Sequence, residues 1–210
     1  MPAKEIKDRG MVTWLVNTST REQTRLELPR WAHPFALTPD GKSFIAALYD
    51  LEARKIHLAL VSRDGKDVTK LTEIHSEGPH PKPSPDGSRI LFQDYDPTDK
   101  VEKDVPRLTR LFVYNLKTRQ RERLADVPHN AALISYCWSP DGKRLAYAWK
   151  QVRPGVPLAE NTTNMNDPKL NTETESHLMI ADADGRNART VLSAKAQRST
   201  SVTLGSMDWR

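Results

Sequence analysis

The residues of this sequence with chemically versatile side chains fall at two kinds of position. Aromatic and charged residues end three apolar runs, and histidines lie in polar connections. Together with one arginine they form the set of candidate binding residues: Tyr49, Asp50, His75, His80, Asp94, Tyr95, His129, Trp149, Lys150 and Arg153. Side chains of these types can hold a peptide or a small polar ligand, because they combine flat apolar surface with hydrogen-bonding groups.

The three histidines could in principle bind zinc together with Asp94 or Asp96, since imidazole nitrogens and carboxylate oxygens are zinc ligands. Their spacing matches no zinc motif, so we predict no metal. The sequence also lacks a Gly-x-Ser-x-Gly nucleophile elbow, a His-Glu-x-x-His pair and a glycine-rich phosphate loop. We therefore predict no cofactor and no catalytic residue. Cys137 is the single cysteine, which excludes an intrachain disulfide.

A Pro-Asp-Gly turn recurs three times, each time before an apolar run. Its aspartates, Asp40, Asp86 and Asp141, are 46 and 55 residues apart, a period typical of propeller blades. Proline fixes φ, aspartate accepts backbone N–H groups, and glycine takes a positive φ without steric cost. These properties are what a hairpin turn requires. We therefore predict a structural role, that of closing hairpins, for all nine turn residues: Pro39, Asp40, Gly41, Pro85, Asp86, Gly87, Pro140, Asp141 and Gly142.

Each repeat unit contains four predicted strands. The units cover residues 31–72, 79–125 and 131–193, and their strands are 31–38, 43–50, 55–62 and 66–72; 79–84, 89–95, 110–116 and 119–125; and 133–139, 144–149, 177–183 and 187–193. Residues 11–28 predict two further strands and residues 201–210 one more, which we expect to share a blade. The sequence thus predicts an all-β fold, a single β-propeller domain over residues 1–210 with about four antiparallel four-stranded blades. A fragment of a larger propeller and ring closure by self-association are the alternatives.

The segments around Thr38, Ser84 and Ser139 resemble the WD-like repeat of the TolB-type β-propeller family. "WSPDGKRLAYAW", from Trp138, carries this resemblance, and "KDVTKLT", which ends at Thr72, is similar to the end of the family's repeat. The resemblance covers about residues 10–210. It implies a bacterial propeller in the periplasm or secreted, with the cytoplasm as the alternative. The family includes binding proteins and the propeller domains of peptidases.

Two connections are longer than a propeller scaffold requires, residues 96–108 and 150–176. In a propeller they emerge on the same face, and long connections of this kind are commonly functional. We therefore predict a non-enzymatic scaffold that binds a protein or peptide partner through this face. An accessory or degenerate propeller of a hydrolase is one alternative. A small-molecule or sugar-binding, lyase-like propeller is the other.

The charge of the chain does not indicate a nucleic-acid partner. It carries 32 basic and 27 acidic residues, a net charge of +5, which is typical of a solvated surface. Arg119, Arg121 and Arg123 alternate along a predicted outer strand, where charge protects a sheet edge; an RNA contact is the alternative use. No apolar run reaches the roughly 18 residues of a membrane-spanning helix, so we predict no membrane insertion.

Overall fold

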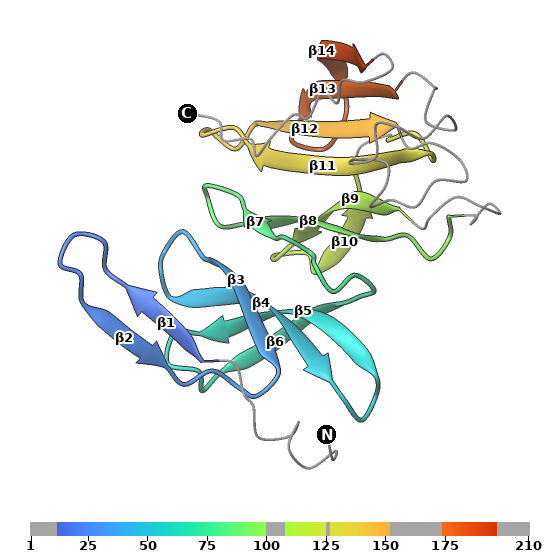
Figure 1. The fold of residues 1–210 in the computed structure, drawn as a ribbon. Helices are drawn as coiled ribbons and strands as arrows, with labels where there is room; N and C mark the ends of the chain where they lie inside the picture. The colour runs from blue at the N-terminus through green and yellow to red at the C-terminus, as the bar shows by residue number, and fades with distance from the viewer. Residues whose placement is uncertain (1–11, 100–107, 125–126, 152–173, 197–210) are drawn as a thin grey trace. The chain divides into compact units, whose positions relative to one another are not determined.

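The structure of the chain is a computed structural model that describes residues 12–99, 108–124, 127–151 and 174–196. All regular secondary structure in these ranges is β, and every strand pair is antiparallel (Figure 1). Among the described residues, three sheets have four strands each, and one sheet is a two-stranded hairpin. The prediction of an all-β fold built from four-stranded antiparallel sheets is confirmed. Residues 201–210, predicted to complete a further blade, lie outside the described ranges.

The chain divides into two compact units, residues 1–83 and 84–210. The first unit contains the hairpin β1–β2 and a four-stranded sheet in the order β3-β4-β5-β6. Its strands are β1 (Thr13–Val16), β2 (Gln23–Leu26), β3 (Ala32–Leu37), β4 (Ser43–Asp50), β5 (Lys55–Ser62) and β6 (Val68–Ile74). The inner strands β4 and β5 are almost continuously apolar, and Ala46 and Val61 pack with Ala32, Leu28 and Leu48.

The second unit contains most of one four-stranded sheet, in the order β10-β9-β8-β7, and all of another, β11-β12-β13-β14. The strands are β7 (Lys82–Pro83, at the boundary), β8 (Arg89–Tyr95), β9 (Thr109–Asn115), β10 (Gln120–Arg123), β11 (Ala131–Trp138), β12 (Arg144–Gln151), β13 (Thr174–Asp182) and β14 (Arg189–Ala196). Side chains of both sheets form one core, which includes Leu91, Leu111, Trp138, Leu145 and Tyr147.

Two strands differ from their predicted lengths for physical reasons. The strand predicted at 79–84 is reduced to the two residues of β7, because Pro79, Pro81 and Pro83 have no N–H to donate to a neighbouring strand. β13 begins at Thr174, three residues before its predicted start, and β14 continues to Ala196. The added residues are mostly polar, so apolar alternation did not reveal them.

The three Pro-Asp-Gly segments form the same turn. In each, the carboxylate accepts the hydroxyl of the Ser or Thr two residues earlier and the N–H two residues later, and the glycine has a φ of 67–70°. The turns join β3 to β4, β7 to β8 and β11 to β12. The segment Ser62–Gly65 repeats these hydrogen bonds between β5 and β6, without a proline. The described residues include no helix with the length and hydropathy needed to cross a bilayer.

Acid should loosen the second of these turns. The hydroxyl of Ser84, followed by the hydroxyl and N–H of Ser88, lowers the pKa of Asp86 from 3.8 to about 2. Because the pKa in the folded chain is the lower one, the carboxylate stabilises the fold fully above about pH 4, and this contribution is lost as the pH falls toward about 2. We expect urea-unfolding midpoints to fall over this range by less in Asp86→Asn than in the wild type. Identical pH profiles for the two proteins would contradict this assignment.

Candidate functional site

In the first unit, Tyr49 and Asp50 lie at the end of β4. The ring of Tyr49 is tilted against His33, with centroids 4.9 Å apart. Burial raises the pKa of the Tyr49 hydroxyl, and the charge of Glu77 adds to this. The Asp50 carboxylate accepts the Ala53 N–H and pairs with Lys70, both at 3.0 Å, and these contacts lower its pKa in that order. Both predicted residues are therefore held by local contacts.

A second pair of charges lies across β5 and β6 beside this position. Lys55 on β5 and Glu73 on β6 are joined at 2.6 Å, and His57, the cross-strand partner of Glu73, is half-buried. Burial and, after it, the charge of Lys70 lower the pKa of His57. Its Nδ1 atom is buried and has no hydrogen-bond partner among the residues that the structure describes. His75 and His80 are exposed in the connection after β6, where His80 lies edge-on to Phe35.

In the second unit, Asp94 at the end of β8 is fully buried. Its carboxylate pairs with Arg121 on β10 at 2.9 Å, and the Arg121 guanidinium lies 3.9 Å from the centre of the Phe112 ring. Next to it, Tyr95 is half-buried. A buried charge that has an ionic partner favours a structural role for Asp94 over ligand binding.

The arginines expected to protect a sheet edge have other contacts. Arg119 lies in the turn between β9 and β10 with a φ of 57°, not on the strand. Arg121 pairs with Asp94, and Arg123 bridges Asp96 and Asp99 at 3.0 and 2.8 Å. These partners lie at the end of β8 or in the segment after it, 24 to 27 residues away in the sequence, so the spacing of the arginines could not reveal them.

Arg110 on β9 contacts two connections, the one that follows β8 and the one that precedes β11. Its side chain is only 3% exposed. The Nε atom pairs with Asp99, and the two Nη atoms donate to the carbonyls of Pro128, His129 and Ala131 at 3.0–3.4 Å. The predicted residue His129 thus contributes its backbone carbonyl to this clamp, while its side chain is exposed.

An aromatic and ionic group lies across β12, β13 and β14, and we call it the β13 group. The rings of Trp149 and His177 are stacked with centroids 4.1 Å apart and planes 17° apart. His177 Nε2 lies 3.0 Å from Glu175 Oε2, and His177 Nδ1 lies 3.0 Å from Ser193 Oγ. Lys195 pairs with Glu175 at 2.5 Å. These five side chains share one face of the sheet, because they are cross-strand partners or lie two positions apart.

The sequence identified only Trp149 from this group. His177, Glu175, Ser193 and Lys195 lie at or beyond the ends of the predicted strands, in a stretch without an apolar pattern. The alternation of the polar residues Glu175 and His177 is the signal in the sequence that could have indicated a longer strand here. Lys150 is half-buried beside Trp149 on β12, and Arg153 lies outside the described residues. The three predicted histidines are divided between the units, and in the described ranges no cluster of His, Cys, Asp or Glu could hold a metal ion.

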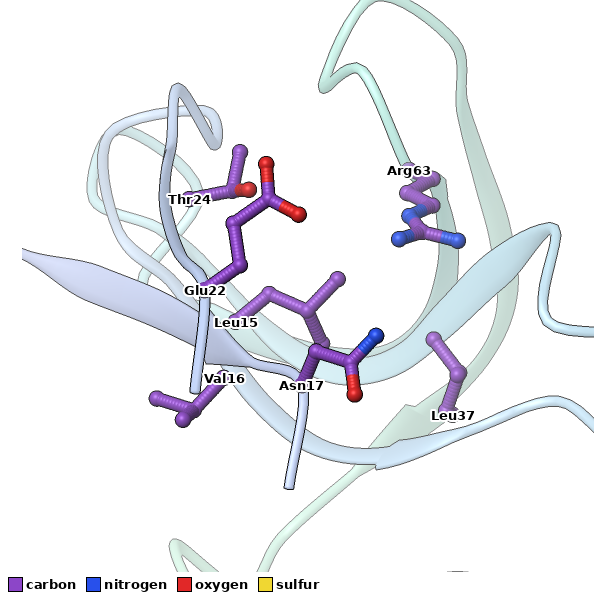
Figure 2. Close-up of a pocket in the computed structure, with 7 residues that line it drawn as sticks. All are labelled: Leu15, Val16, Asn17, Glu22, Thr24, Leu37 and Arg63. Carbon is purple, nitrogen blue, oxygen red and sulfur yellow. The ribbon is translucent and has the colours of Figure 1, made fainter. Parts of the chain in front are cut away.

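A pocket of about 250 Å³ in the first unit involves none of the predicted residues. It is lined by Leu15, Val16, Asn17, Glu22, Thr24, Leu37 and Arg63 (Figure 2). Leu37 ends β3 and Arg63 follows β5, so the pocket is at the turn end of this sheet, away from Tyr49 and Asp50. Figure 2 shows the side chains of Glu22 and Arg63 well separated around it.

Comparison with known proteins shows one curated relative and several similar folds. The chain is 29% identical over 171 residues to the uncharacterized peptidase YuxL of Bacillus subtilis, which covers 69% of this chain and 24% of that protein. No family model matches the chain. A TolB from Agrobacterium tumefaciens superimposes with a TM-score of 0.52 at 19% identity, covering 85% of this chain and 54% of that one.

An oligogalacturonate lyase from Vibrio parahaemolyticus gives a TM-score of 0.53 at 14% identity, covering 88% of this chain and 48% of that one. The chain therefore spans about a quarter of its curated relative and about half of these similar structures. At such identities the likeness shows the fold alone. Four-stranded antiparallel sheets, a recurring Pro-Asp-Gly turn and these neighbours together confirm that the chain has the fold of the TolB-type β-propellers.

Proposed function

We propose that this chain is a non-enzymatic β-propeller that binds a protein or peptide through the face bearing the connections 96–108 and 150–176. The observation that supports this proposal is the β13 group. It combines a stacked pair of aromatic rings, Trp149 and His177, with the Glu175–Lys195 ion pair. Tryptophan with neighbouring charged groups is a typical anchor in protein interfaces.

The position of the group in the sheet also supports binding. The face of the sheet that packs into the core at Leu145 and Tyr147 continues along β12 to Trp149, where burial decreases. Trp149 is thus supported on one side by the core and is half-exposed at the end of the strand, beside the connection 150–176. A rigid aromatic side chain loses little conformational entropy when a partner covers it.

A selection from a displayed octapeptide library against the full chain tests this proposal. We expect specific peptides to be enriched, and Trp149→Ala to weaken binding of a selected peptide by about 30-fold or more, the loss typical of an interface hot spot. Deletion of residues 153–172 should weaken it as well. Dissociation constants measured by fluorescence anisotropy give the comparison.

Trp14→Ala is the matched control, because Trp14 is also a partly exposed tryptophan on a strand but belongs to the other unit. It should leave peptide binding unchanged. Circular dichroism must show intact sheets for each variant. Failure to enrich any peptide, or equal losses for Trp14→Ala and Trp149→Ala, would reject binding at this face.

A second candidate function is that of a propeller segment of a peptidase. The 29% identity to YuxL over 171 residues favours it. In that case the peptide bound at the same face is a substrate delivered to a catalytic part elsewhere. The reading frame on both sides of this sequence tests it: a downstream Gly-x-Ser-x-Gly segment in an α/β pattern supports the peptidase, and its absence from the complete frame rejects it.

The compartment that accords with the resemblance is the periplasm or the exterior, which cell fractionation tests.

A further inference from the structure

Three side chains of the β13 group form a hydrogen-bonded chain with the order of a nucleophile, a base and an acid. Ser193 Oγ and Glu175 Oε2 each lie 3.0 Å from a different nitrogen of the His177 ring. A carboxylate only accepts hydrogen bonds, so His177 Nε2 carries the proton that binds Glu175. Nδ1 then has a free lone pair that accepts the Ser193 hydroxyl, and this is the arrangement that activates a serine.

A β-bulge creates this contact. His177 pairs with Ser193, and Leu178 with Leu192, but Met179 pairs with Thr190. Without the register shift after Leu178, His177 would face Leu192 instead of Ser193. Bulges often re-aim a side chain in this way at functional positions.

Glu175 is held as an ion. The ammonium of Lys195, followed by His177, lowers its pKa below the usual range. The carboxylate therefore favours the tautomer of His177 that carries its proton on Nε2, which leaves Nδ1 to accept the Ser193 hydroxyl. Since Lys195 contacts Oε1 and His177 contacts Oε2, the two interactions do not compete.

The histidine ring is fixed, and the serine is accessible. Trp149 covers one face of the ring at 4.1 Å, and the His177 side chain is 15% exposed. Ser193 is exposed on β14, the outer strand of its sheet. A substrate can thus reach the hydroxyl while the base keeps its orientation.

We infer that Ser193 is a nucleophile that takes the acyl group of a small activated carboxylic ester. Ser193 Oγ forms the bond to the carbonyl carbon, and its proton passes to His177 Nδ1. The bond to the alcohol oxygen then breaks, and the alcohol leaves with the proton from Nδ1. Water hydrolyses the acyl-serine by the same route in reverse order. This activity goes beyond the proposed binding of a peptide: it would replace the non-enzymatic part of that proposal and leave the binding itself as it stands.

The test uses the full chain and p-nitrophenyl acetate as the probe. We expect release of p-nitrophenolate and one acetyl group mapped to Ser193 by peptide mass analysis. Ser193→Ala should abolish this label. His177→Gln should slow acylation by about 100-fold or more, because a positioned base contributes a factor of that order. Ser193→Cys should still be acylated and should form a thioester. An active Ser193→Cys variant shows that Ser193→Ala is inactive because it lacks a nucleophile and not because it is unfolded.

Ser19→Ala is the matched control, since Ser19 is an exposed serine in the β1–β2 turn and donates to Asn17 through its backbone N–H. It should react like the wild type. Glu175 is a positioning residue, so Glu175→Gln should slow acylation and Glu175→Asp should restore part of the rate. An acetyl group on Lys195, or equal release by Ser193→Ala and wild type, overturns the inference. Peptide binding is measured on the wild-type chain, so a chain that binds a selected peptide but takes no acetyl group at Ser193 overturns this inference alone and leaves the proposed function standing.

Discussion

Replacing Arg110 by methionine is expected to lower the free energy of unfolding by about 4 kcal/mol, the loss typical of removing one partner from a buried ion pair. The guanidinium is almost fully buried and contacts one carboxylate and three backbone carbonyls. Methionine fills a similar volume, so the loss comes from the polar groups that are left without a partner. Urea unfolding followed by circular dichroism measures it.

Arg123→Met is the matched control for this prediction. Arg123 shares Asp99 with Arg110 but is 35% exposed, and water can replace its contacts. We expect it to cost about 1 kcal/mol or less, as exposed ion pairs do. If both variants lose the same stability, the carbonyl contacts of Arg110 contribute nothing measurable to the free energy of unfolding. The role assigned to Arg110, that of joining the two connections, is then wrong.

Replacing Gly65 by alanine is expected to destabilise the first unit by about 3 kcal/mol, near the upper end for single substitutions. Gly65 has a φ of 77°, and a Cβ atom there would lie 1.9 Å from the carbonyl oxygen of Glu27. The neighbouring atom belongs to the backbone, so it cannot move aside without shifting the segment after β2. The β5–β6 turn and this segment would have to separate, which should be visible as a lower thermal unfolding temperature.

Gly41→Ala separates the two causes of the Gly65→Ala loss, which are the positive φ and the contact of the new Cβ with the Glu27 carbonyl. Gly41 has a similar φ of 70°, but its Cβ would meet only the end of the Leu37 side chain at 3.9 Å. It should therefore cost only the backbone strain, about 1 kcal/mol. A Gly65→Ala loss no larger than that of Gly41→Ala would show that the close approach to Glu27 is absent in solution.

The predicted candidate site is incomplete because its key contacts are distant in the sequence. Asp94 and Trp149 were identified from their positions at strand ends, yet one is buried against Arg121 and the other is stacked on His177. Apolar alternation predicts where a strand runs, but it does not say which residue of the next strand lies opposite. His177 and Ser193 had no apolar signal, and a bulge sets their pairing.

The sequence by itself determined the turns and, through them, the sheets. In each Pro-Asp-Gly segment the hydrogen bonds join residues at most five positions apart, so the local residue types were enough to specify the hairpin. The hydrogen-bond partners of Arg110 and of His177, by contrast, are 11 to 21 residues away on other strands or connections, apart from Glu175. Only the tertiary structure decided these contacts, because strand register and burial depend on how whole strands pack.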